Sequence, residues 1–164
     1  SKNCFDWIKS NTPADAVFLS WWDYGHSIKG YAERDVVIKN PSLEIMNYVN
    51  DNTTTKEYDS NAKILDVSRA FLTNNASETI EIMHKYCATY VFVYEDDLGK
   101  TPWMAKFLGL DMSNYAAGQE PDGTWTPSQG LSQTVICQLS QNGISGFTLV
   151  YQDESAKVYK ISDP

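Results

Sequence analysis

The chain has 164 residues, of which 42% are hydrophobic and 21% are charged, so it is long enough to form one domain with a real core. Its longest uninterrupted apolar stretch, Tyr90–Tyr94, falls far short of the roughly 20 residues that a membrane-spanning helix needs. Thirteen basic and 21 acidic residues give a net charge of -8, without a basic run of three residues. Because binding to a nucleic-acid backbone requires clustered lysines and arginines, we expect no nucleic-acid partner.

Hydrophobic periodicity predicts alternating helices and strands along the chain. We expect helices over residues 3–11, from 40–41 onward, 59–72, 76–87, from 101–102 onward and 129–141. We expect strands over residues 16–22, 36–38, 89–95, 146–153 and 156–161. Asn75 with Glu78 is a candidate capping box for the helix over residues 76–87. The glycines, prolines and polar residues of 111–130 predict a loop or a small excursion from the fold. The pattern predicts a mixed α/β fold, with helices packed on a small sheet and a β-hairpin at the C-terminal end.

Cysteine and histidine are too sparse for a structural zinc site. Cys4, Cys87 and Cys137 form no C-x-x-C pair, and the chain has only two histidines, His26 and His84. At most one disulfide is possible, and two of the cysteines lie in apolar periodic segments, where buried free thiols are common.

Familiar catalytic motifs are largely absent from the sequence. The sequence has no G-x-S-x-G elbow, phosphate-binding loop or H-E-x-x-H motif, and two histidines without a motif argue against a Ser-His-Asp triad. The three consecutive acids Glu95, Asp96 and Asp97 follow a predicted strand and could bind a divalent ion through oxygen ligands. A solvated loop is the favoured interpretation of this cluster.

The most unusual feature is Trp21–Gly25, which follows a predicted strand. An indole N–H only donates and a carboxylate only accepts, so the indoles of Trp21 and Trp22 and the carboxylate of Asp23 together complement a hydroxyl group, which does both. Gly25 would permit a tight turn that exposes the group. Alternatively, Trp21 and Trp22 are core side chains and Asp23 caps the next helix, and the residues alone leave both interpretations open.

The segment Trp21–Gly25 resembles the WWDYG signature of the oligosaccharyltransferase catalytic subunit, the enzyme of protein N-glycosylation. Further segments are similar to this family in order and character: Asn11–Ala16, Ser20, Arg69–Ala70, Glu81–Met83 and Tyr90–Val93. A second family motif, D-x-x-K-x-x-x-M/I, has its counterpart in Asp97, Lys100 and Met104. Without the first motif, Met104 would be read as a core residue and Lys100 as a solvated lysine.

The resemblance implies that residues 1–164 form the C-terminal globular domain of a larger multi-span membrane enzyme. That enzyme transfers an oligosaccharide from a dolichol-type lipid to the asparagine of Asn-x-Ser/Thr sequons in an acceptor polypeptide. It implies that Trp21, Trp22 and Asp23 contact the sequon hydroxyl and that Met104 contacts the same side chain. Burial of the extra methyl group of threonine would then favour Thr over Ser by roughly 1 kcal/mol or less.

By the same resemblance, Lys100 belongs to this substrate-binding set, and Tyr24, Gly25 and Asp97 support it. The acids that hold the catalytic Mn or Mg ion lie in the membrane portion of the family, so this fragment alone is expected to bind no metal and to be inactive. The domain would lie on the extracellular face of the cell membrane, or in the lumen of the endoplasmic reticulum in a eukaryote. The compact length favours an archaeal single-subunit enzyme.

Two alternatives come from other functional classes. With 13% aromatic residues, the chain could be a stand-alone carbohydrate-binding module, or it could be a small secreted hydrolase. The chain also contains two sequons of its own, beginning at Asn52 and Asn75, which are hypothetical glycan acceptors.

Overall fold

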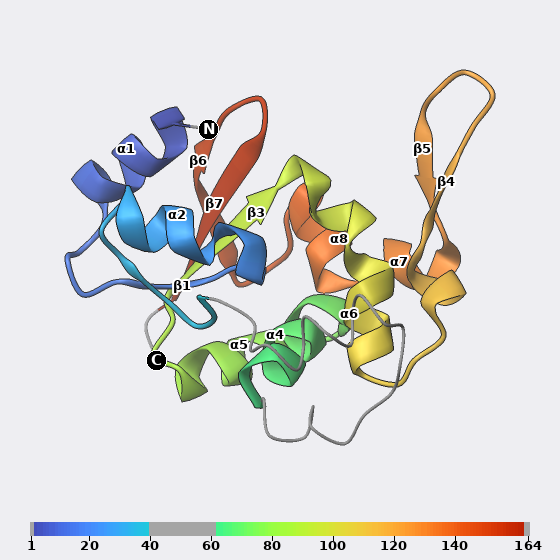
Figure 1. The fold of residues 1–164 in the computed structure, drawn as a ribbon, viewed down its shortest axis with the longest axis horizontal. Coiled ribbons are helices and arrows are strands. Elements are labelled where there is room, and N and C mark those ends of the chain that lie inside the picture. Colours follow the sequence, from blue (N-terminus) through green and yellow to red (C-terminus); the bar gives the residue numbers. More distant parts are fainter. Residues whose placement is uncertain (1, 40–61, 163–164) are drawn as a thin grey trace.

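The computed structural model describes residues 2–39 and 62–162 and contains a mixed five-stranded sheet in the order β2-β1-β3-β7-β6 (Figure 1). The strands are β1 (Val17–Leu19), β2 (Asp35–Val36), β3 (Tyr90–Tyr94), β6 (Phe147–Gln152) and β7 (Ala156–Ile161). Strand β1 runs parallel to both β2 and β3, whereas β3, β7 and β6 are successively antiparallel. This arrangement confirms the predicted α/β class and the C-terminal hairpin.

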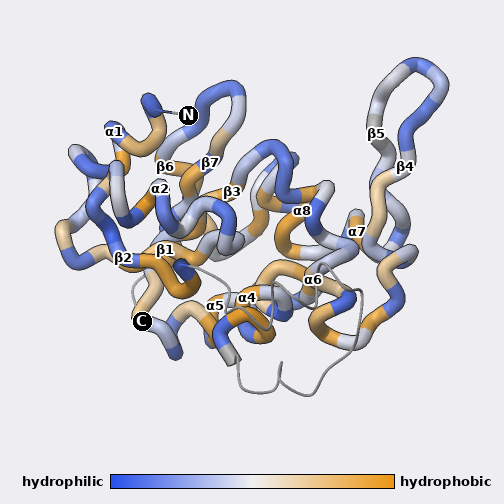
Figure 2. Tube along the Cα trace, in the orientation of Figure 1, coloured by the Kyte–Doolittle hydropathy of each residue, from blue (hydrophilic) through white to orange (hydrophobic). Residues whose placement is uncertain are grey.

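Helices lie on both sides of the sheet (Figure 1). One side carries α1 (Lys2–Asn11) and α2 (Gly25–Gly30); the other carries α4 (Ala62–Leu72), α5 (Ala76–Lys85), α6 (Thr101–Phe107) and α8 (Val135–Ser140). The central strand β3 serves both cores, because alternate side chains point to opposite faces. Tyr90 and Phe92 join the core beneath α1 and α2, and Val91 and Val93 join the opposite core. Hydropathy along the chain is accordingly highest in the segments that line these cores (Figure 2).

The first predicted strand, over residues 16–22, was too long. The structure ends β1 at Leu19, and Trp22–Tyr24 form a short 3-10 helix, η1, that leads directly into α2. The strand predicted over residues 36–38 is also shifted, to β2. The apolar run continues past β1 because Trp21 remains buried after the chain has left the sheet.

Helix ends explain the other differences. The helix predicted over 129–141 is divided into α7 (Gln129–Ser132) and α8, because the Thr134 hydroxyl accepts a hydrogen bond from the Cys137 N–H and caps α8. Asn75 caps α5 as predicted, but it accepts from Ser77 at 3.0 Å, and the Glu78 carboxylate accepts instead from the Thr73 hydroxyl at 2.6 Å. The capping box with Glu78 is therefore wrong. The helix predicted from residues 40–41 lies outside the described residues.

Residues 111–130 form a small excursion, as predicted. They contain the 3-10 helix η4 (Met112–Tyr115) and an antiparallel ribbon of β4 (Ala117–Gln119) and β5 (Trp125–Pro127), which projects from the body of the molecule (Figure 1). Cys4 and Cys137 are buried, whereas Cys87 is exposed. Among the helices described, none is long and apolar enough to cross a membrane.

Candidate functional site

The sheet topology brings the two sequence motifs to the same place. Strands β1 and β3 are parallel neighbours, with Phe18 opposite Tyr90 and Leu19 opposite Val91. The carboxyl ends of parallel strands meet at one edge of a sheet, where ligand sites of open α/β folds commonly lie. Here η1 follows β1, and the 3-10 helix η3 (Glu95–Gly99) follows β3. The two motifs therefore meet, although Tyr24 and Lys100 are 76 positions apart in the sequence.

Lys100 joins the motifs directly. Its Nζ atom lies 2.5 Å from Oδ2 of Asp23 and donates a hydrogen bond of 2.8 Å to the Tyr24 hydroxyl. The same ammonium group lies 4.6 Å from the centre of the Tyr24 ring, within cation–π range. The side chains of Lys100 and Asp23 are only 25% and 33% exposed, so the interpretation of Lys100 as a solvated lysine is wrong.

Asp97 lies fully buried behind this ion pair. Its Oδ2 atom accepts a hydrogen bond from the Tyr94 N–H at 2.9 Å, whereas Oδ1 has no hydrogen-bond partner in the described part of the chain. Burial raises the pKa of Asp97 to about 7, although the Tyr94 N–H and the Lys100 charge oppose this shift. Glu95 and Asp96 are exposed, so the solvated-loop interpretation holds for them and is wrong for Asp97.

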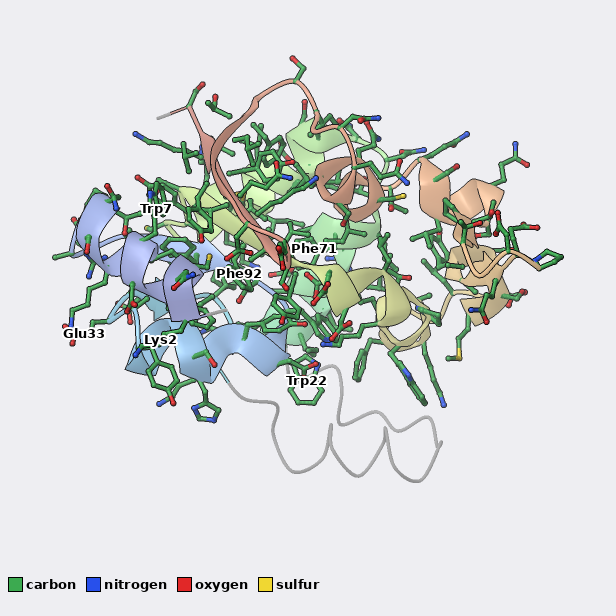
Figure 3. All side chains as sticks on the ribbon, turned by 90° about the horizontal axis from the view of Figure 1, so that it is seen from above. Lys2, Trp7, Trp22, Glu33, Phe71 and Phe92 are labelled. Carbon is green, nitrogen blue, oxygen red and sulfur yellow. The ribbon has the colours of Figure 1, made fainter. Side chains whose placement is uncertain are left out.

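The two tryptophans have different environments. Trp21 is only 2% exposed and packs against Trp22 and Phe107, with ring centres 6.1 and 6.2 Å away, so it is a core side chain. Trp22 is half-buried and lies at the rim of the molecule, whereas Phe71 and Phe92 lie in its interior (Figure 3). The Nε1 atom of Trp22 is buried, and no acceptor among the described residues pairs with it.

Gly25 is required for space rather than for a turn. Its φ of -56° is an ordinary helical value, so the predicted turn role is wrong. A Cβ atom at this position would lie 2.5 Å from the carbonyl oxygen of Ile38 and 2.7 Å from the Cα atom of Lys39. The absence of a side chain lets the segment after β2 pass directly over the start of α2.

Tyr24 rests on aromatic side chains of β3 that sequence analysis did not assign to the site. Its ring centre lies 5.3 Å from that of Phe92 and 5.0 Å from that of Tyr94. Burial, and then the nearby Asp97 carboxyl, raise the pKa of the Tyr24 hydroxyl far above its usual value. The alternation of aromatic residues along β3 was the available signal, because it marks one face of that strand.

Met104 lies one turn into α6 and is fully buried in the same core as Trp21. The structure thus brings together Trp22, Asp23, Tyr24 and Lys100 at a partly exposed position, with Asp97 behind them. Trp21 and Met104 belong to the core beneath. Within the described residues, no group of three or more His, Cys, Asp or Glu side chains could hold a metal ion.

The chain is similar to several known proteins. The domain of unknown function DUF6798 matches residues 1–42, which include the whole of η1. The STT3B subunit of dolichyl-diphosphooligosaccharide–protein glycosyltransferase from Oryza sativa is 31% identical over 129 residues. This match covers 74% of the present chain and 15% of the rice protein, so the chain spans a small part of the length of such relatives.

Solved structures share the fold over nearly the whole chain. The C-terminal globular domain of an oligosaccharyltransferase from Archaeoglobus fulgidus has a TM-score of 0.65 at 19% identity and covers 98% of this chain and 95% of that one. An A. fulgidus oligosaccharyltransferase tethered to an acceptor peptide with an NVT sequon has a TM-score of 0.64 at 20% identity, covering 93% of this chain and 23% of that chain. The fold is that of the C-terminal globular domain of oligosaccharyltransferases. The sequence is similar to their STT3 subunits, and the resemblance seen in the motifs is confirmed.

Proposed function

We propose that residues 1–164 are the C-terminal domain of an oligosaccharyltransferase and bind the hydroxyl side chain of an Asn-x-Ser/Thr acceptor. The observation that carries this proposal is the buried Trp22 Nε1–H without a described acceptor, next in sequence to the partly exposed Asp23 carboxylate. A buried donor left unpaired costs about 1–3 kcal/mol, so its retention favours a partner supplied by a ligand. A hydroxyl fits, because it can accept from the indole and donate to the carboxylate.

Lys100 acts through Asp23 in this proposal. Its ammonium group pairs with one carboxylate oxygen and with the Tyr24 hydroxyl, which fixes the carboxylate from the protein side. The other oxygen of Asp23 is then the one available to an acceptor hydroxyl. Lys100 is accordingly a positioning residue rather than a substrate contact.

Trp21 and Met104 support the site from the core. Trp21 packs against Trp22, and Phe107 on α6 packs against Trp21, so α6 backs the tryptophan pair. This packing supports the proposal that α6 forms part of the site, as the family motif implies. Contact between Met104 and the methyl group of an acceptor threonine stays a prediction, because Met104 is fully buried in this structure.

The whole enzyme would transfer an oligosaccharide from a dolichol-type lipid to the acceptor asparagine. Its catalytic Mn or Mg ion does not fit the present site, because Lys100 already pairs with the Asp23 carboxylate and Asp97 is bonded to the Tyr94 N–H. The metal would therefore be held outside this domain, together with the lipid-linked donor. The domain would lie on the extracellular or lumenal face of the membrane. No observation here favours the carbohydrate-binding module or the hydrolase.

The test is peptide glycosylation by the full-length enzyme, with Asn-x-Thr and Asn-x-Ala peptides compared. Asp23→Ala removes the acceptor of a charge-assisted hydrogen bond and should lower transfer to Asn-x-Thr by about 1.5–3 kcal/mol of transition-state stabilisation. Trp22→Phe keeps most of the aromatic area and removes the donor, so its loss should be nearer 1 kcal/mol. Asp96→Asn, at an exposed neighbouring acid, is the matched control and should leave transfer unchanged.

The ratio of transfer to the two peptides separates recognition from folding, because it does not depend on the amount of folded enzyme. Asp23→Ala should lower the ratio of transfer to Asn-x-Thr over transfer to Asn-x-Ala. Lys100→Met should lower this ratio less, and Lys100→Arg should restore it. If Asp23→Ala keeps the wild-type preference for Asn-x-Thr, the recognition role is wrong. A loss of folded protein in Trp22→Phe with an unchanged ratio would identify Trp22 as a core residue only.

A further inference from the structure

The sequon Asn75-Ala76-Ser77 lies at the start of α5, on the side of the molecule that carries α4 and α5 (Figure 1). Asn75 and Ser77 are both exposed. Asn75 has an extended backbone, with φ of -112° and ψ of 105°, and its side-chain oxygen accepts from the Ser77 N–H at 3.0 Å. Helix capping therefore uses the oxygen of this amide and leaves its nitrogen uninvolved.

We propose that Asn75 is an N-glycosylation site and carries an oligosaccharide on Nδ2. An asparagine amide has an acceptor oxygen and a nitrogen with two hydrogens, so the two atoms can serve different functions. The oxygen caps α5, whereas neither Asn75 Nδ2 nor the Ser77 hydroxyl has a hydrogen-bond partner among the residues described. A glycosylated amide keeps its oxygen and one N–H, so the cap and the glycan are compatible.

The modification has a simple atom balance. The Nδ2–C1 bond to the first sugar forms, and the C1–O bond to the phosphate of the lipid carrier breaks. The phosphate leaves with the electron pair of that bond, and Nδ2 loses one proton. The co-reactant is a lipid-linked oligosaccharide, so the inference rests on the proposed function for its setting on the glycosylating face of the membrane.

The surface next to Asn75 has room for a glycan. An open cleft of about 480 Å³ begins at Thr73 and Asn74, the two residues before Asn75, and at Glu78 in the first turn of α5. Its other lining residues include Arg69, Gln133 and Tyr115. These side chains offer charged, amide and aromatic groups, which are the kinds of partner that sugar hydroxyl groups and ring faces use.

Modification should precede the folding of α5. In the folded chain, the Ser77 N–H is bonded to Asn75, and Ser77 lies in the first helical turn. A site that grips the asparagine amide and the hydroxyl two residues later would compete with this cap. The glycan is therefore added while the segment is still extended, and the cap forms afterwards around the modified side chain.

The experiment is secretion of the chain from yeast, whose own enzyme supplies the modification, in an Asn52→Gln background that removes the other sequon. Trypsin releases residues 70–85 as one peptide, and its mass reports the occupancy of Asn75 before and after enzymatic removal of N-glycans. Asn75→Asp removes the acceptor nitrogen and keeps a capping oxygen, since Asp caps as well as Asn. Ser77→Ala removes the hydroxyl and keeps the backbone N–H, and Asn74→Asp is the matched control.

We expect a glycan on the peptide from the parent chain and from Asn74→Asp, and none from Asn75→Asp or Ser77→Ala, with all four chains secreted and melting at similar temperatures. An unmodified peptide from a secreted, folded parent chain would overturn the proposal, as would a glycan on Ser77→Ala. Because the host enzyme acts here, this outcome is independent of whether Trp22 and Asp23 recognise acceptors. A failure at Asn75 and a failure of the proposed function are thus distinguishable.

Discussion

Replacing Asp97 by asparagine should change how the stability of the domain depends on pH. The carboxyl group is fully buried, and burial raises its pKa from 3.8 in a model compound to about 7. The folded state therefore holds a proton that the unfolded chain releases near pH 4. Since the folded state binds more protons between these two values, the free energy of unfolding falls as the pH rises from about 4 to about 7.

The size of the effect follows from the shift. One pKa unit corresponds to about 1.4 kcal/mol, so a shift of about three units gives roughly 4 kcal/mol as an upper limit. Asparagine is nearly isosteric and cannot ionise, and its side-chain oxygen can still accept from the Tyr94 N–H. Asp97→Asn should therefore lose this pH dependence and be more stable than the wild type above pH 7.

Urea unfolding at several pH values between 4.5 and 8.5 measures this difference. The quantity to compare is the free energy of unfolding of Asp97→Asn minus that of the wild type, because other titrating groups then cancel. Asp96→Asn, which changes an exposed neighbour, should give a nearly constant difference. A constant difference for Asp97→Asn would refute the argument that Asp97 is buried with its proton.

Two further predictions concern packing and a buried cation. Gly25→Ala should destabilise the domain by about 2 kcal/mol or more in thermal or urea unfolding, because its Cβ would lie 2.5 Å from the Ile38 carbonyl oxygen. Gly30→Ala should be neutral or stabilising, because no atom lies within 4 Å of the added Cβ. Equal losses of stability in the two variants would contradict the argument that Gly25 is needed for space. Arg34 is 8% exposed and donates five hydrogen bonds. Arg34→Met should therefore lower the free energy of unfolding by about 3 kcal/mol or more. Lys29→Met, which removes an exposed ion pair, should lower it by less than about 1 kcal/mol. Similar losses in the two variants would show that Arg34 contributes only as a surface charge.

Sequence patterns predicted the main elements because their signals are local. The alternation in Tyr90–Tyr94 marks a strand that is buried on both faces, and Asn75 has the side chain that a helix start requires. The end of β1 could not be read in this way, since Trp21 is as apolar as the strand residues but is buried after the chain has left the sheet. The hydrophobicity of a residue indicates that it is buried, but it does not indicate whether its backbone forms the hydrogen bonds of a sheet. The end of a strand is defined by those hydrogen bonds.

The sequence motifs name the residues of the candidate site but do not give their arrangement in space. Three consecutive acids give no indication of which one points inward, so the burial of Asp97 depends on contacts that lie outside its own segment. The pairing of Lys100 with Asp23 likewise depends on β1 and β3 being neighbours. The close approach at Gly25 involves the backbone after β2, which no pattern around Gly25 encodes.

The parallel register of β1 and β3 has a consequence for how this domain can diverge. The two halves of the site are attached to neighbouring strands, so their relative position is set by the Phe18–Tyr90 and Leu19–Val91 pairs and not by the length of chain between them. Insertions or deletions between Gly25 and β3 can accumulate while the ion pair of Asp23 and Lys100 stays in place. Related domains should therefore vary most in the length of this interval, and the two short motifs should remain recognisable in sequences whose overall alignment fails.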